Sequence, residues 1–208
     1  MKFCIRLRLE PNDTQKARLQ DLQRVFAQVC NALAPTVQST RVWNRVALHH
    51  MAYKVLREAY PALGSQMVCN AIYAVSKSAR LVFQTPKSPF YIDKYKDKPL
   101  PLLRFLPSCP VYFDKHTLSL RAGLLSMYTL DGRLKFELAL SSAQAAAFMQ
   151  RRLLEIVLQQ AADGGFEMKF WLGEPLDCEL PADQWLKEDE TQELLSAIPA
   201  YVAVEAAE

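Results

Sequence analysis

Histidine is the side chain that titrates near neutral pH, and the sequence holds three of them, His49, His50 and His116. A histidine beside a ribose can act as general base or general acid toward the 2′-hydroxyl, which cleaves RNA without a metal ion. His49 and His50 are consecutive in a predicted helix and point about 100° apart, so at most one of them can serve. A metal-independent endoribonuclease is therefore one hypothesis, and surface or capping histidines are the alternative.

The cysteines are scattered along the chain and odd in number: Cys4, Cys30, Cys69, Cys109 and Cys178. No two of them are spaced as Cys-X-X-Cys, so the sequence indicates neither a zinc site nor a disulfide framework. Buried or idle thiols in a reducing cytosol are the expected state. No motif requires a metal, nucleotide or redox cofactor, and we expect none.

One predicted helix carries a row of polar side chains. Asn70, Tyr73, Lys77 and Arg80 are spaced by three, four and three residues, and Gln84 follows four residues later. In a helix this spacing places them on one stripe. Amide donors, cations and an aromatic ring in one row suit a helix laid against a nucleic-acid groove. A solvated polar face is the alternative interpretation.

The charges are divided unequally along the chain. Residues 1–115 hold 18 lysines and arginines against 7 acidic residues, whereas residues 116–208 hold 7 against 15, which leaves a net charge of +3. A basic half of this size suits a polyanion, because clustered cations release counterions from phosphates. The acidic half indicates either a solvated surface or a patch that faces a basic protein.

Further candidate phosphate contacts lie in two places. Arg6 and Arg8 alternate with apolar residues in 2–9, which predicts a strand with a basic edge that either contacts phosphate or stays solvated. The Pro- and Lys-rich stretch 85–110 predicts an irregular linker. Its cations and aromatic rings can bind single-stranded nucleic acid, by contacts to phosphates and by stacking on bases. The alternative is that the linker is a solvated loop. The cations of the linker are Lys87, Lys94, Lys96, Lys98 and Arg104, of which Lys94, Lys96 and Arg104 are the chosen candidates for phosphate contacts.

Apolar spacing predicts the remaining elements. Helices are expected from the Asn12 or Asp13 cap to Pro35, over 44–60, and from a Ser65 cap to about 84. Period-two alternation over 110–140 predicts a four-stranded meander, with Asp131-Gly132 as a type I′ hairpin turn. A helix over 142–162, a strand over 166–172, and an acidic tail with a short helix near 191–198 complete the prediction.

No apolar run approaches the roughly 20 residues that span a bilayer, and the N-terminus carries no apolar signal region. We therefore expect a cytoplasmic protein without a membrane segment. The fold class that the pattern favours is α+β. Its centre is a small antiparallel sheet or barrel, with three helices inserted after the first strand and a helix, a strand and a tail at the C-terminal end.

Two stretches carry a resemblance to a known family. They are NRVALHHMAYKVLREAYPALGSQMVCNAIYAVSKSAR, residues 44–80, and FLPSCPVYFDKHTLSLRAGLLSMYTLDGRLKFELALS, residues 105–141. Together with the opening strand and helix, they resemble the N-terminal half of the transposon-encoded TnpB proteins and of the type V CRISPR effectors. The resemblance covers roughly residues 2–141.

The resemblance implies a wedge domain, an OB-like β-barrel, from residues 1–10 and 105–175, with the helix 142–162 added to it. It implies a helical recognition domain over 11–85, a basic linker over 86–104, and an acidic segment over 176–208 that departs from the family. In the family these modules hold a guide RNA and help to read a motif beside the target DNA. By resemblance, the stripe of residues 70–80 lies near that motif, and Tyr53, Lys54 and Arg57 are second candidates.

The family's RuvC nuclease domain has no counterpart here. It needs three separated carboxylates for two metal ions, and the residues that follow Leu140 contain no strand that opens on a catalytic aspartate. The leading hypothesis is a nuclease-free subunit that holds a guide RNA, with target DNA as a second candidate ligand, and works with other protein subunits. The alternatives are the endoribonuclease above and a protein-interaction remnant of a TnpB-like protein.

Overall fold

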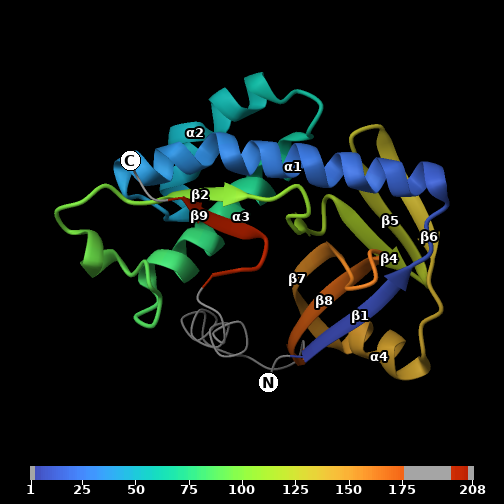
Figure 1. Ribbon diagram of the computed structural model, residues 1–208. Helices are drawn as coiled ribbons and strands as arrows, with labels where there is room; N and C mark the ends of the chain where they lie inside the picture. The colour runs from blue at the N-terminus through green and yellow to red at the C-terminus, as the bar shows by residue number, and fades with distance from the viewer. Residues whose placement is uncertain (1–2, 176–197, 206–208) are drawn as a thin grey trace.

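The computed structural model describes residues 3–175 and 198–205 (Figure 1). The first part of the chain forms one strand and four helical segments: β1 (Phe3–Leu9), α1 (Asp13–Thr40), α2 (Arg45–Ala59), α3 (Ser65–Gln84) and the 3-10 helix η1 (Ile92–Tyr95). The elements that follow are β2 (Leu102–Phe105), β3 (Val111–Phe113), β4 (Leu118–Arg121), β5 (Leu124–Thr129), β6 (Gly132–Glu137), α4 (Ser142–Gln150), β7 (Arg151–Gln160), β8 (Phe166–Pro175) and β9 (Val202–Glu205). The fold is a mixed α+β fold, as the sequence predicts.

The strands form three antiparallel sheets. The largest has the order β1-β8-β7-β3, the second has the order β4-β5-β6, and β2 pairs with β9. Within the described residues none of these sheets closes into a barrel, so the closed barrel expected from the sequence is not found. The predicted meander is also divided, because β3 leaves it to pair with β7.

Two hairpin turns join the strands of the second sheet. Ala122 and Gly123, with φ of 48° and 80°, form the two-residue loop between β4 and β5, which is the type I′ pattern. At the next turn Gly132 has a φ of 88°, whereas Asp131 does not have a positive φ. The type I′ turn predicted at Asp131-Gly132 is therefore wrong, and that geometry occurs one hairpin earlier.

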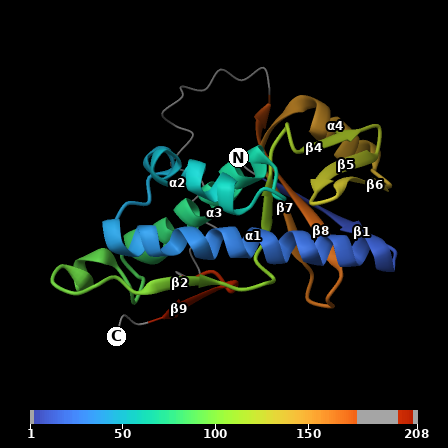
Figure 2. The same cartoon turned by 90° about the horizontal axis from the view of Figure 1, so that it is seen from above.

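Helix α1 spans the molecule and contacts both its helical and its β parts (Figures 1 and 2). It begins with a capping box in which the side chains of Asn12 and Gln15 each accept a hydrogen bond from the other's backbone N–H. The prediction that Pro35 ends this helix is wrong, because the helix continues to Thr40. Val37 is buried two residues beyond Pro35, so continued burial of the apolar face offsets the hydrogen bond that proline removes.

Helices α2 and α3 pack against each other and against α1, and α3 also contacts β3. Asn44 caps α2 by accepting from the backbone N–H groups of Val46 and Ala47. The predicted bounds of α3 are correct, although its capping residue is Gly64 and not Ser65. The core face of α3 includes Val68, Ile72, Val75, Ala79 and Val82, all buried as the spacing predicts.

The predicted helix 142–162 is only partly present. Helix α4 ends at Gln150, and the chain continues as strand β7 between β3 and β8. Ile156, Val157 and Leu158 are buried in succession, which is typical of a strand covered on both faces. Pairing with two neighbouring strands therefore overrides the helical spacing of this segment.

The linker and the tail are more ordered than the sequence predicts. Leu100 and Leu103 are buried against the core, so the C-terminal end of the segment 86–104 is packed, whereas its lysines are exposed. Residues 202–205 pair with β2 as β9, so this part of the tail does not fray. The short helix predicted near 191–198 lies outside the described residues except for Ile198. No helix in the described ranges is long and apolar enough to cross a membrane.

Candidate nucleic-acid interface

The predicted stripe on α3 is mostly turned toward the protein. Asn70 is buried, and its amide contacts the sulfur of Met67. The hydroxyl of Tyr73 donates to Oε2 of Glu155 at 2.7 Å, and Nζ of Lys77 lies 3.1 Å from Oε1 of the same carboxylate. Arg80 alone of the four is exposed. Tyr73 and Lys77 therefore tie α3 to β7, and Asn70 is buried with its contact inside α3.

The carboxylate of Glu155, on β7, is the centre of a cluster of rings and cations. The ring of Tyr73 meets that of Tyr112 edge to face at 5.4 Å, and Lys77 Nζ lies 5.5 Å from the centre of the Tyr112 ring. On the other side, Arg45 lies 5.3 Å from the centre of the Tyr73 ring. This cluster joins α2 and α3 to β3 and β7. Its aromatic and charged side chains therefore have a structural role, because they pack on one another where the elements meet.

The acidic half of the chain neutralises part of the basic half. Arg8 forms an ion pair with Asp163, and Arg104 forms one with Glu205 at 3.0 Å. The hydrogen bond from Arg8 lowers the pKa of Asp163, and the hydrogen bond from Arg104 lowers the pKa of Glu205. All four side chains are half-exposed, so these pairs are accessible to a competing phosphate.

The other predicted residues on α2 and after α3 differ in exposure and in their side-chain contacts. Lys54 is exposed on α2, whereas the Arg57 guanidinium donates to the backbone carbonyl of Leu63 at 2.7 Å. The ring of Tyr53 stacks on that of His49 at 4.6 Å. Lys96 is exposed and lies 3.6 Å from Asp93.

Lys94 is also exposed, and its ammonium donates to the carbonyl of Ser88 at 3.0 Å. Each of these candidates in the helical part therefore lies on α2, on α3 or in the segment that follows α3.

We call residues 41–100 the basic segment. It holds ten lysines and arginines against three acidic residues. Eight of the ten cations are exposed: Arg41, Arg45, Lys54, Arg80, Lys87, Lys94, Lys96 and Lys98. α2, α3 and the chain that follows them occupy the end of the molecule away from β4–β6 (Figures 1 and 2). Positive charge therefore gathers at one end of the fold.

The sequence alone did not single out Arg41 or Arg45, and it marked Lys87 and Lys98 only as cations of the linker. Arg41 ends α1 in a left-handed conformation, and its guanidinium donates to the carbonyls of Tyr95 and Lys98 at 2.8 and 2.6 Å. It therefore ties the segment after α3 to the end of α1. The signal available in the sequence was the charge of the whole segment and not any spacing of individual residues.

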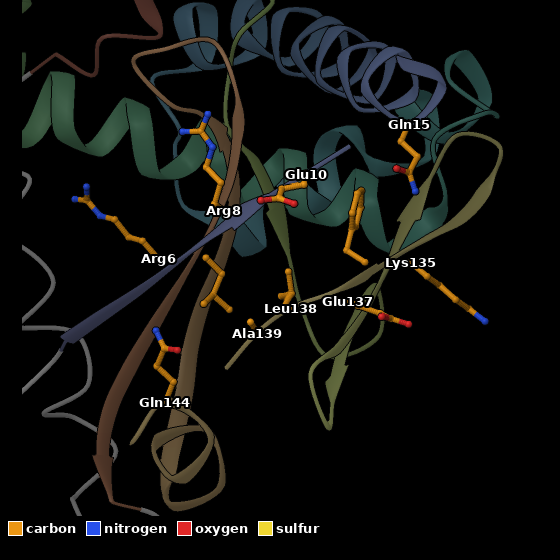
Figure 3. Close-up of a pocket in the computed structure, with 11 residues that line it drawn as sticks. Arg6, Arg8, Glu10, Gln15, Lys135, Glu137, Leu138, Ala139 and Gln144 are labelled. Atoms are coloured by element: carbon orange, nitrogen blue, oxygen red, sulfur yellow. The ribbon is translucent and has the colours of Figure 1, made fainter. Parts of the chain in front are cut away.

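Arg6 and Arg8 lie elsewhere, on the outer edge of β1. With Lys135 and Glu137 of β6 they line a cleft of about 610 Å³ between the two strands (Figure 3). Gln15 of α1 and Gln144 of α4 stand at opposite ends of this cleft in the figure. β1, which carries these two arginines, lies with the sheets, away from the end of the molecule that holds the basic segment (Figure 1).

The titratable candidates for RNA cleavage do not form one constellation with a carboxylate among the described residues. His49 and His50 lie on α2 with their rings 5.9 Å apart, and His116 lies in the turn after β3. In the ranges that the structure describes, no three histidine, cysteine, aspartate or glutamate side chains gather as a metal site requires.

Comparison with known proteins gives no assignment. No family model matches the chain, and no curated protein matches it.

Proposed function

We propose that this chain is the RNA-holding subunit of a ribonucleoprotein and that it does not itself cut nucleic acid. The observation that supports this proposal most is the basic segment, in which eight of ten cations are exposed at one end of the fold. Exposed, clustered cations favour a polyanion, since each neutralised phosphate releases counterions. The partly buried rings of Phe90, Tyr91 and Tyr95 lie among these exposed cations in the sequence after α3, and a ring that keeps an open face offers a surface on which a base can stack.

The order of elements supports a relationship to the TnpB and type V effector family. In this proposal β1, β3 to β8 form the wedge module as an open barrel, and α1 to α3 form the helical recognition module. The guide RNA scaffold contacts Lys54, Arg80, Lys94, Lys96 and Lys98, and target DNA is a second ligand of the same face. Other protein subunits supply any effector activity.

Salt dependence tests this function directly. The logarithm of the affinity for a structured hairpin RNA should fall linearly with the logarithm of salt concentration. Neutralising three exposed cations of the basic segment, with Lys54→Gln, Arg80→Gln and Lys98→Gln together, should reduce the magnitude of that slope by about 2.

The matched control neutralises three exposed cations outside the basic segment, with Lys16→Gln, Arg121→Gln and Lys135→Gln together. Both triple variants change the net charge equally, so the control separates local contacts from the overall field. The control should keep the wild-type slope. No saturable RNA binding at low salt, or an equal loss in both triple variants, would overturn the proposal.

A further inference from the structure

Helix α4 lies on the surface although it carries no charged side chain. Its sequence, SAQAAAFMQ, contains no lysine, arginine, aspartate or glutamate, and none of its residues is buried. A surface helix of a globular protein usually presents charged side chains on its outer face. Met149, near the C-terminal end of α4, instead keeps 79% of its surface exposed. An uncharged and uncovered helix with a protruding methionine is typical of a surface that another molecule covers.

An apolar groove runs beside this helix. It has a volume of about 510 Å³ and lies between α4 and the end of the β4–β5 hairpin. Its lining side chains, Leu120, Leu138 and Phe148 among them, are apolar apart from Arg121, and Met149 stands at the same groove. Figures 1 and 2 show α4 close to the β4-β5-β6 sheet. The surface therefore combines a protruding apolar side chain with a hollow that an apolar side chain could fill.

The sheet beside the groove adds a pattern of charges. Arg121 of β4 pairs with Leu124 of β5, and Leu124 pairs with Glu137 of β6, so the three side chains form one row across the sheet. All three are exposed, Leu124 at 42%. Within the described residues neither Arg121 nor Glu137 takes part in an ion pair. The row therefore has a positive charge at one end, a negative charge at the other, and an apolar side chain between them.

We infer that this surface is a two-fold interface with a second copy of the chain. The row is complementary to its own copy turned by 180°, because Leu124 then meets Leu124 and each Arg121 lies opposite Glu137 of the other copy. In this arrangement Met149 of each copy enters the groove of the other, since every contact in such an interface occurs twice.

The charges of the surface also argue against other occupants. α4 and the groove supply a single cation, Arg121, whereas a nucleic acid requires several. The row holds one positive and one negative end, so it favours neither an acidic nor a basic partner. A self-complementary row selects a copy of the same surface.

Sedimentation of the full-length, nuclease-treated chain between about 1 and 300 µM tests the inference. We expect a reversible monomer–dimer equilibrium. Met149→Glu should weaken the dimer at least about tenfold, because it places a charge in the apolar interface twice. The matched control Met51→Glu changes a methionine that is 47% exposed on α2, away from the β4-β5-β6 sheet, and should leave the equilibrium unchanged.

Charge reversal tests the two-fold pairing itself. Arg121→Glu alone and Glu137→Arg alone each set like charges opposite one another at two symmetry-related places, and each should weaken the dimer about tenfold. The double variant Arg121→Glu with Glu137→Arg restores opposite charges and should return the dissociation constant to within about threefold of the wild-type value. Damage to the fold by either single variant would not be repaired in this way.

Three results would overturn the inference. They are a chain that stays monomeric over the whole range, a dimer that Met149→Glu and Met51→Glu affect equally, and a double charge variant that dimerises no better than the single variants. In the first case another protein or a lipid is the occupant of the groove. The measurement uses RNA-free protein, and RNA binding is tested with the triple variant of the basic segment, so a failure of this inference and a failure of the proposed function are distinguishable.

Discussion

The Glu155 carboxylate is expected to stabilise the fold more than any exposed acidic residue does. It accepts from Tyr73 at 2.7 Å and from Lys77 at 3.1 and 3.2 Å. The side chains of Lys77 and Glu155 are only 16% and 11% exposed. Glu155→Ala therefore removes the carboxylate that the Tyr73 hydroxyl and the mostly buried Lys77 ammonium share.

The magnitude follows from this burial. Exposed ion pairs contribute about 0–1 kcal/mol, whereas breaking a buried pair costs about 3–5 kcal/mol. The Tyr73 hydrogen bond to a charged acceptor adds about 1.5–3 kcal/mol when measured alone, and the two losses are not additive because they share one carboxylate. We expect Glu155→Ala to lower the free energy of unfolding by about 3 kcal/mol, or the Tm by about 6–12 °C for a chain of this size.

The assay is urea unfolding followed by circular dichroism, with the midpoint and the slope fitted separately. Glu137→Ala is the matched control, because Glu137 is exposed on β6, and it should change stability by less than about 0.5 kcal/mol. The double variant Lys77→Met with Glu155→Leu should recover most of the loss, because it removes both charges from the buried site. A loss below about 1 kcal/mol in Glu155→Ala would refute this account of the cluster.

Further predictions concern a turn, a thiol and an ion pair. Ala122→Asn should stabilise the chain by about 0.5–1 kcal/mol, because φ is 48° there. Gly123→Ala should instead destabilise it, since the new Cβ would meet a backbone oxygen at 2.8 Å; chemical denaturation measures both variants. Burial raises the pKa of the Cys30 thiol well above its usual value, so a thiol reagent at pH 8 should modify Cys30 only after unfolding. Arg8 lowers the pKa of Asp163, so the pair's stabilisation is complete above about pH 5 and is lost as pH falls through the lowered value; Arg8→Ala should return the NMR titration of Asp163 to its ordinary range.

Local periodicity was sufficient for much of the fold. The bounds of α3 and the strands β1, β5 and β6 follow from apolar spacing, because each of these elements buries one face and exposes the other. The turns after β3 and β4 also depend on local sequence, since Asp114 and Gly123 have the chemistry that turns require.

Long-range pairing explains the errors. In the segment 151–160, apolar residues fit a helical spacing, and the segment becomes a strand because β3 and β8 lie on its two sides. The short strand β9 has no signal of its own and forms because β2 offers it an edge. Neither partner can be identified from the local sequence, because the pairing residues lie far apart in the chain.

In the candidate site, too, the contacts between residues far apart in the sequence could not be predicted. A stripe on α3 predicts that Tyr73 and Lys77 share a face, and they do. The spacing does not show that Glu155, 78 residues beyond Lys77, occupies that face. The charge of the basic segment was visible in the sequence, since the sum over many residues does not depend on where any one side chain points.

The measurement that tests the central claim most directly is sequencing of the RNA that copurifies with the chain from its own host. The triple variant Lys54→Gln, Arg80→Gln and Lys98→Gln should be purified in parallel. The proposed function predicts one enriched RNA, with a structured scaffold and a variable end, on the wild-type chain and its loss from the variant. A clean protein without enriched RNA, or the same RNA on both proteins, would contradict it.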